Sequence, residues 1–197
     1  MAMKISRTGF GQVEPNHLSA QRTSQIYAQL PAAPEINILE NGQFVKYDYA
    51  HKGDDGKLTP QCNFEGKGEW MMVFNEVKLY DDAWRESYKD FAMQKDNYTP
   101  GGDITHNGVG PFPGQMTPRV IKTNVGDIYT TNCVGAGNTS GKASYAGIDL
   151  EVGDIVGPTT ASNGFLVKDA DEGVKFEVVK VYTMADGQPA VKLMRIE

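Results

Sequence analysis

The residue types that most often carry catalysis or bind metal ions are scattered in this sequence. His17, His51 and His106 lie far apart, and no two of them have the i, i+4 spacing of a helical zinc motif. Ser140 lies outside the Gly-x-Ser-x-Gly context that exposes a nucleophilic serine. We therefore predict no catalytic residue and no metal ligand, and we expect that the protein is not an enzyme.

Glycines and acidic residues give no stronger signal for a bound ligand. Gly135-x-Gly137 is not followed by a predicted helix, so the context of a nucleotide-binding loop is missing. Asp54-Asp55 and the acids of residues 169–172 lack the regularly spaced oxygen ligands of a calcium loop. We interpret both acidic stretches as solvated turns and expect no cofactor.

Cys62 and Cys133 are the two cysteines of the chain, and their separation fits no metal-binding motif. A chain of 197 residues can build a core without a disulfide. We expect free, buried thiols, while a disulfide between them stays an alternative.

Aromatic residues in the predicted strands could form a carbohydrate-binding face. The candidates are Tyr47, Tyr49, Trp70 and Tyr80. Aromatic side chains on strands more often belong to the core, and this is the interpretation that we favour.

Composition disfavours some classes of partner. The chain has 25 acidic and 19 basic residues and a formal net charge of −6, which disfavours binding to a phosphate backbone. No apolar run has the length of a membrane span, and residues 1–7 lack the apolar core of a signal peptide. We therefore expect synthesis in the cytoplasm, with neither nucleic acid nor a membrane as a direct partner.

Short strands separated by turns dominate the sequence pattern. Residues 176–196 alternate on either side of a turn at 184–188, which predicts a terminal hairpin. The tetrapeptide Val-Gly-Asp-Ile occurs at 125–128 and again at 152–155, and each copy predicts a tight turn before a strand. These patterns predict a mainly β protein, either a small β-barrel or a sandwich.

Two further strands are expected in the first half of the chain. Alternation predicts a strand over residues 44–49. A strand over 70–80 has apolar residues on both faces, with Trp70 and Met72 on one side and Met71 on the other. This pattern is typical of a central strand that is covered on both sides.

One helix and one long loop are predicted after these strands. Trp84, Tyr88, Phe91 and Ala92 form a single apolar stripe, which predicts a packed helix over about residues 82–96. Residues 97–118 are rich in glycine and proline, and we expect a contact loop that a partner orders.

Residues 1–35 form a polar, amide-rich segment, which predicts an extended N-terminal arm. Ser19 is expected to cap a short helix that reaches Leu30. The apolar residues of this segment favour an arm that docks on the body or on a neighbouring molecule over a disordered tail. The residues expected to contact a partner lie in this arm and in the loop over residues 97–118. They are Arg7, Phe10, His17, Leu18, Arg22, Ile26 and Tyr27 in the arm and Phe112 in the loop.

Three regions follow from these patterns. They are the arm at 1–35, a region of strands, helix and loop at 36–118, and a β-barrel-like region at 119–197. In the alternative division, residues 36–197 form one domain.

Two stretches of the chain carry recognisable motifs. The opening has ISRTGFG at 5–11 and NHLSAQR at 16–22, and the ending has VVKVYTM at 178–184 and VKL at 191–193. Both stretches resemble small structural proteins of tailed bacteriophages and related prophages. The order of Val-Gly-Asp-Ile, Asn-Gly-Phe-Leu-Val and a terminal hairpin is similar to the β-barrel of phage head-decoration proteins.

The resemblance implies a non-enzymatic virion protein on the capsid surface. Such an auxiliary or decoration protein binds and stabilises the lattice of the major capsid protein, and neighbouring copies of itself are further partners. Two alternatives stay open: a head fibre or host-surface-binding module, and a head–tail connector or tail component. If the arm orders only on the lattice, residues 1–35 of the free protein should exchange their amide hydrogens rapidly.

Overall fold

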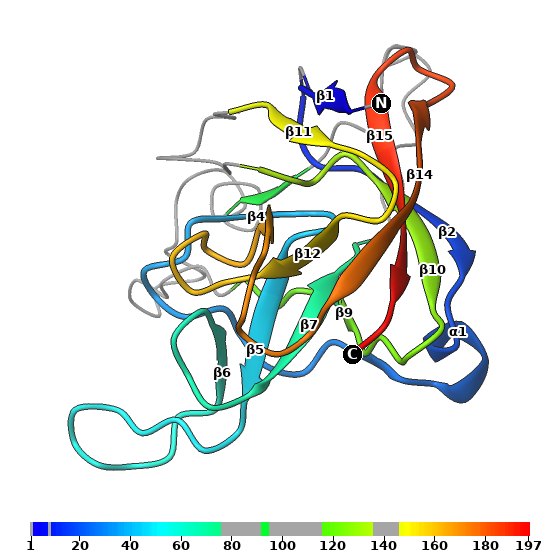
Figure 1. Cartoon of the computed structure of the whole chain (residues 1–197). Coiled ribbons are helices and arrows are strands. Elements are labelled where there is room, and N and C mark those ends of the chain that lie inside the picture. The colour runs from blue at the N-terminus through cyan, green and yellow to red at the C-terminus, as the bar shows by residue number, and fades with distance from the viewer. Residues whose placement is uncertain (1, 8, 76–91, 95–115, 136–145) are drawn as a thin grey trace, which may run out of the picture.

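A computed structural model describes residues 2–7, 9–75, 92–94, 116–135 and 146–197. The protein is mainly β, as the sequence predicts, with two antiparallel sheets that pack on each other as a sandwich (Figure 1). In these parts of the chain, no helix is long and apolar enough to cross a membrane.

The first sheet has six antiparallel strands in the order β13-β12-β14-β15-β10-β2. Its centre is the hairpin of β14 (Phe176–Thr183) and β15 (Pro189–Arg195), which confirms the predicted terminal hairpin. The other strands are β13 (Leu166–Lys168), β12 (Ile155–Pro158), β10 (Ile128–Thr131) and β2 (Val13–His17). Because the edge strands β13 and β2 do not pair with each other, the sheet is open, and the sandwich alternative replaces the barrel.

The second sheet has five strands in the order β3-β9-β7-β5-β6. They are β3 (Ile26–Tyr27), β9 (Val120–Ile121), β7 (Glu69–Val73), β5 (Phe44–Asp48) and β6 (Gln61–Asn63). Two ribbons pair β1 (Met3–Ile5) with β11 (Ile148–Leu150) and β4 (Ile38–Glu40) with β8 (Ala92–Gln94). Strands from all three regions of the sequence therefore lie side by side in one sheet.

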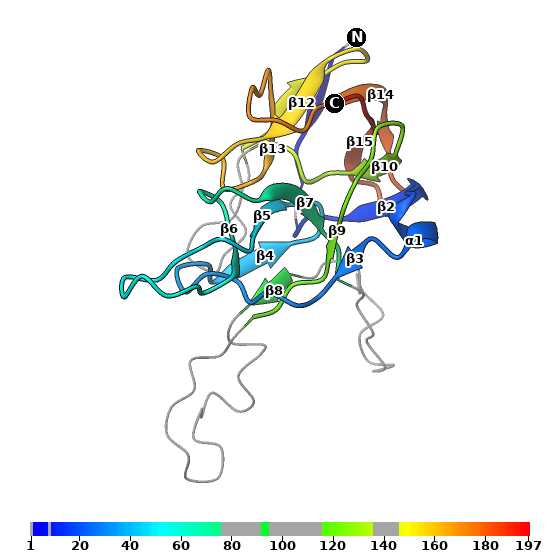
Figure 2. The ribbon, with the colours of Figure 1, turned by 90° about the horizontal axis from the view of Figure 1, so that it is seen from below.

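Strand β7 explains why the five-stranded sheet is buried on both faces. Trp70 and Met72 belong to the apolar cluster between the two sheets, whereas Met71 and Val73 belong to a second cluster on the opposite face. The β4–β8 ribbon lies on that opposite side (Figure 2), and its Leu39 and Met93 contribute to the second cluster. The predicted central strand is confirmed, although it ends at Val73; residues 76–80 lie outside the described residues.

The described part of residues 1–35 docks on the body of its own molecule, which is one of the two docking modes that the sequence left open, and it takes part in the sheets. Strands β1, β2 and β3 pair with β11, β10 and β9. Ile5 and Leu18 are 1% and 3% exposed and pack in the core between the sheets. The segment therefore docks on its own molecule, and we correct the expected rapid exchange: amides paired in strands should exchange slowly.

Both predicted helices differ from the structure. Helix α1 spans only Ala20–Thr23, because Ser24 has a φ of 57° and the chain then continues as β3. In the predicted 82–96 helix, residues 92–94 instead form β8, whose pairing with β4 buries Met93. The remainder of that helix, and residues 97–115 of the predicted loop, lie outside the described residues.

Candidate functional site

The first Val-Gly-Asp-Ile copy forms a tight turn that ties the N-terminal segment to the terminal hairpin. The Asp127 nitrogen donates to the Asn124 carbonyl at 2.9 Å, and the Asn124 nitrogen donates to Asp127 Oδ2 at 2.8 Å. Gly126 has a φ of 91°, which glycine adopts without strain. Its nitrogen donates to the Arg195 carbonyl at 2.8 Å, and the Arg195 nitrogen donates back to the Asp127 carbonyl at 2.9 Å.

The second copy repeats this construction on the neighbouring strand of the hairpin. The Asp154 nitrogen donates to the Glu151 carbonyl at 3.1 Å, and the Glu151 nitrogen donates to Asp154 Oδ2 at 2.9 Å. Gly153 has a φ of 94°, and its nitrogen donates to the Val178 carbonyl at 2.8 Å. The repeated tetrapeptide is therefore a repeated turn, and both predicted turns are confirmed.

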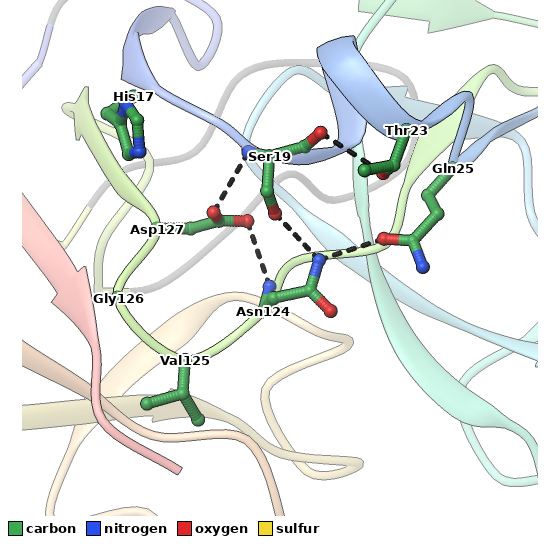
Figure 3. A pocket seen from close by; sticks show the side chains of 8 residues that line it. All are labelled: His17, Ser19, Thr23, Gln25, Asn124, Val125, Gly126 and Asp127. Atoms are coloured by element: carbon green, nitrogen blue, oxygen red, sulfur yellow. Dashed lines mark hydrogen bonds between the residues drawn. The ribbon is translucent and has the colours of Figure 1, made fainter.

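A shallow, open pocket of about 410 Å³ lies beside the first turn (Figure 3). One wall comes from residues 17–25 of the N-terminal segment and the other from residues 124–127. Its lining is formed by His17, Ser19, Thr23, Gln25, Asn124, Val125, Gly126 and Asp127. We take this pocket as the candidate site because polar side chains from two distant segments meet there.

Most polar atoms of the pocket bond to one another. Asp127 is 2% exposed, and its Oδ1 accepts from the Ser19 nitrogen at 2.9 Å. Asn124 Nδ2 donates to Ser19 Oγ at 2.8 Å and to Gln25 Oε1 at 2.9 Å (Figure 3). The Ser19 hydroxyl therefore accepts from Asn124, and this contact replaces the predicted helix cap, for which α1 shows no side-chain bond.

The pocket does not join its serine hydroxyl to its imidazole. Among the residues drawn, no hydrogen bond joins the Ser19 hydroxyl to the His17 ring, so the two do not form a nucleophile–base pair (Figure 3). The exposed residues of the lining are His17, Thr23, Val125 and Gly126, and Val125 is 69% exposed.

A second polar cluster is buried where Arg7 and Gly11 meet the end of β4. Arg7 Nη1 lies 2.6 Å from Glu40 Oε2, and the two side chains are 2% and 0% exposed. The Gly11 nitrogen also donates to Glu40 Oε2 at 2.6 Å, and the Arg7 guanidinium carbon lies 5.4 Å from the centroid of the Phe165 ring. This ion pair fastens residues 7–11 to the end of β4.

Both cysteines are free and buried, as predicted. Burial raises the pKa of the Cys62 thiol to about 12. Burial also raises the pKa of Cys133 to about 12, although the nearby Arg7 guanidinium acts in the opposite direction. At neutral pH both thiols are therefore expected to stay protonated.

The residues predicted to contact a partner do not form one surface. Arg7 and Leu18 are directed into the interior, where they make internal contacts. His17 and Arg22 are exposed, whereas Phe10, Ile26 and Tyr27 are partly buried. Phe112 lies outside the described residues. The sequence argument did not identify Glu40 as a partner of Arg7, nor Asn124 and Asp127 as lining residues of a pocket, although the tetrapeptide repeat marked Asp127 as a turn residue.

The other candidates from the sequence separate into core and surface. Trp70 and Tyr47 are 5% and 3% exposed and belong to the core, as we favoured, whereas Tyr49 is 54% exposed. Tyr80, His106 and Ser140 lie outside the described residues. Across the part of the chain that the structure describes, no three His, Cys, Asp or Glu side chains are grouped to hold a metal ion.

Comparison with protein-family models, curated proteins and solved structures finds no match to this chain.

Proposed function

We propose that the protein is a non-enzymatic virion component, an auxiliary or decoration protein that binds and stabilises an assembled capsid lattice. The major capsid protein is its partner, and neighbouring copies of the chain are secondary partners. The resemblance of the opening and ending stretches to structural proteins of tailed phages supports this proposal.

The structural observation that carries the proposal is the exposure of one valine in each Val-Gly-Asp-Ile turn. Val125 is 69% exposed and Val152 is 64% exposed. The valine is the second of the four residues of each turn. A turn does not require a β-branched apolar residue at its second position, where proline is favoured. Two equivalent turns that each present valine therefore fit a contact role, although an isolated exposed valine would need no explanation.

Rigidity of these turns favours binding to a repetitive surface. Each turn is held on the terminal hairpin by reciprocal backbone hydrogen bonds, at Arg195 and at Val178. A contact residue on an ordered turn loses little conformational entropy when it binds. Many copies on a lattice of repeated sites can also reinforce individually weak contacts through neighbouring copies.

Mass spectrometry of purified virus particles tests the proposal through copy number. A decoration protein is expected in a number comparable to that of the major capsid protein, whereas a connector is expected as a single ring. Absence of the chain from purified particles would overturn the proposal.

A second measurement locates the contact. We expect the Val125→Asp and Val152→Asp double variant to remain folded, because both side chains are exposed, and to be lost from particles. Thr183→Asp, which changes an exposed residue of β14, serves as the control and should be retained.

A further inference from the structure

A row of three tyrosines runs from the second apolar cluster to the surface of the protein. The ring centroids of Tyr27 and Tyr47 are 5.6 Å apart, and those of Tyr47 and Tyr49 are 5.1 Å apart. Tyr47 is 3% exposed, whereas Tyr49 is 54% exposed. Tyr49 directly follows β5, at the base of the β5–β6 loop that projects from the body in Figure 1.

The surroundings of Tyr49 are held in place by hydrogen bonds. The Tyr47 hydroxyl accepts from the backbone nitrogens of Gln29 at 3.2 Å and Leu30 at 3.1 Å. The Asp48 carboxylate accepts from the Ala50 nitrogen at 3.0 Å, which fixes the backbone on the far side of Tyr49. The Tyr49 ring also packs against Tyr47 at an interplanar angle of 75°. An exposed aromatic ring is therefore presented from an ordered backbone.

A polar side chain that can both donate and accept lies beside this ring. Gln29 is exposed, and its Oε1 lies 3.4 Å from the Tyr49 hydroxyl. A primary amide offers two donor hydrogens and an acceptor oxygen, which suits the neighbouring hydroxyl groups of a sugar.

The charge of the protein favours a neutral sugar over anionic ligands that also stack on aromatic rings. A nucleotide would bring phosphate charge to a chain whose formal net charge is −6. In the loop over residues 49–60, the two lysines, Lys52 and Lys57, are balanced in formal charge by Asp54 and Asp55, and Lys57 Nζ lies 3.0 Å from Asp55 Oδ2. A neutral ligand fits this surface better than an anionic one.

We propose that Tyr49 and Gln29 form a subsite for a neutral hexopyranose unit of a glycan. The sugar ring stacks on the exposed side of Tyr49, and the Gln29 amide hydrogen-bonds to its hydroxyl groups. This subsite is separate from the Val-Gly-Asp-Ile turns, so it does not depend on the proposed lattice contact.

The test uses the free full-length protein and a defined panel of neutral sugars: the methyl glycosides of glucose, galactose, mannose and N-acetylglucosamine. Saturation-transfer NMR detects binding, and titration gives the affinity. For a single subsite we expect a dissociation constant in the millimolar range. Tyr49→Ala should weaken binding at least tenfold, Gln29→Ala should weaken it severalfold, and Tyr49→Phe should retain most of it.

The control is Leu58→Ala, which removes a side chain that is 64% exposed in the same loop but carries no aromatic ring. This variant should bind like the parent protein. Failure of every sugar in the panel to bind would overturn the inference, as would an equal loss in Leu58→Ala and Tyr49→Ala. Preferential binding of uridine or adenosine would overturn the sugar assignment. Unchanged thermal midpoints of the variants ensure that a loss of binding reports the subsite.

Discussion

The buried ion pair between Arg7 and Glu40 gives the sharpest prediction about stability. Its two side chains are 2% and 0% exposed, and Glu40 Oε2 accepts from both Arg7 Nη1 and the Gly11 nitrogen at 2.6 Å. Glu40→Gln keeps the size of the side chain but removes its charge, so the buried guanidinium loses the negative charge of this carboxylate. Breaking a buried pair in this way costs about 3–5 kcal/mol of unfolding free energy.

This loss can be measured by urea unfolding and by thermal unfolding. At about 2–4 °C per kcal/mol for a chain of this size, the thermal midpoint should fall by roughly 6–20 °C. Arg7→Met should be comparably destabilising, because it leaves the Glu40 carboxylate buried. The Arg7→Met, Glu40→Met double variant should recover part of the loss, since it removes both buried charges together, although the Gly11 nitrogen loses its acceptor.

A surface pair in the same molecule is the matched control. Lys57 Nζ and Asp55 Oδ2 are 3.0 Å apart, against 2.6 Å in the buried pair, and their side chains are 81% and 55% exposed. Lys57→Ala should leave the unfolding midpoint unchanged within error. If Glu40→Gln were as harmless as Lys57→Ala, or if the double variant were no more stable than either single variant, the reasoning about the buried charge would be refuted.

Three further predictions follow from other contacts. Gly164→Ala should abolish soluble expression or sharply lower the thermal midpoint, because φ is 75° and a Cβ there would collide with the Phe44 carbonyl. Gly56 has a similar φ of 76° but open space around it, so Gly56→Ala should lower the free energy of unfolding by only about 1–3 kcal/mol. The hydrogen bond from Lys168 lowers the pKa of Asp154 most, and the hydrogen bond from the Glu151 nitrogen lowers it further. The contribution of Asp154 to the free energy of unfolding is therefore present above the pKa of the unfolded state, and it is lost as pH falls through the lower pKa of the folded state. Asp154→Asn should therefore show a smaller fall in thermal midpoint on acidification below about pH 4 than the parent, and equal slopes would contradict this assignment. Because burial raises the pKa of both Cys62 and Cys133 to about 12, neither thiol should react with Ellman's reagent at pH 8 until the protein unfolds, and rapid labelling of the native protein would disprove the burial.

Alternation of apolar and polar residues predicted the strands, because the buried face of a strand is set by residues close together in the sequence. Trp70, Met71 and Met72 point alternately to two apolar clusters, and this follows from the period of two along any strand. The Val-Gly-Asp-Ile turns were predictable for the same reason: Gly126 and Asp127 form the turn with residues only a few positions away.

Contacts across long sequence separations were not predictable from such patterns. Arg7 and Glu40 are 33 positions apart, and neither position is distinguished by its neighbours. The Ser19 nitrogen meets Asp127 across 108 positions, so the pocket that they line had no local signature. The apolar stripe ending at Ala92 fitted a helix, but β4 supplied a partner strand for residues 92–94, and tertiary pairing overrode the helical pattern there.

The N-terminal segment was predictable in part from its local pattern and in part not, because its partners are distant in the sequence. Its scattered apolar residues correctly indicated docking, yet the sequence could not distinguish its own body from a neighbouring molecule. Strands β1, β2 and β3 all pair with strands that follow residue 119, so the beginning of the chain is joined to its end in both sheets and in the β1–β11 ribbon. Removal of residues 1–17 would therefore uncover β10 and β11 and break the Arg7–Glu40 pair, so loss of binding in such a truncation would report unfolding as much as a missing contact. A lattice contact is better sought in Val125 and Val152, whose side chains can be changed while the sheets stay intact.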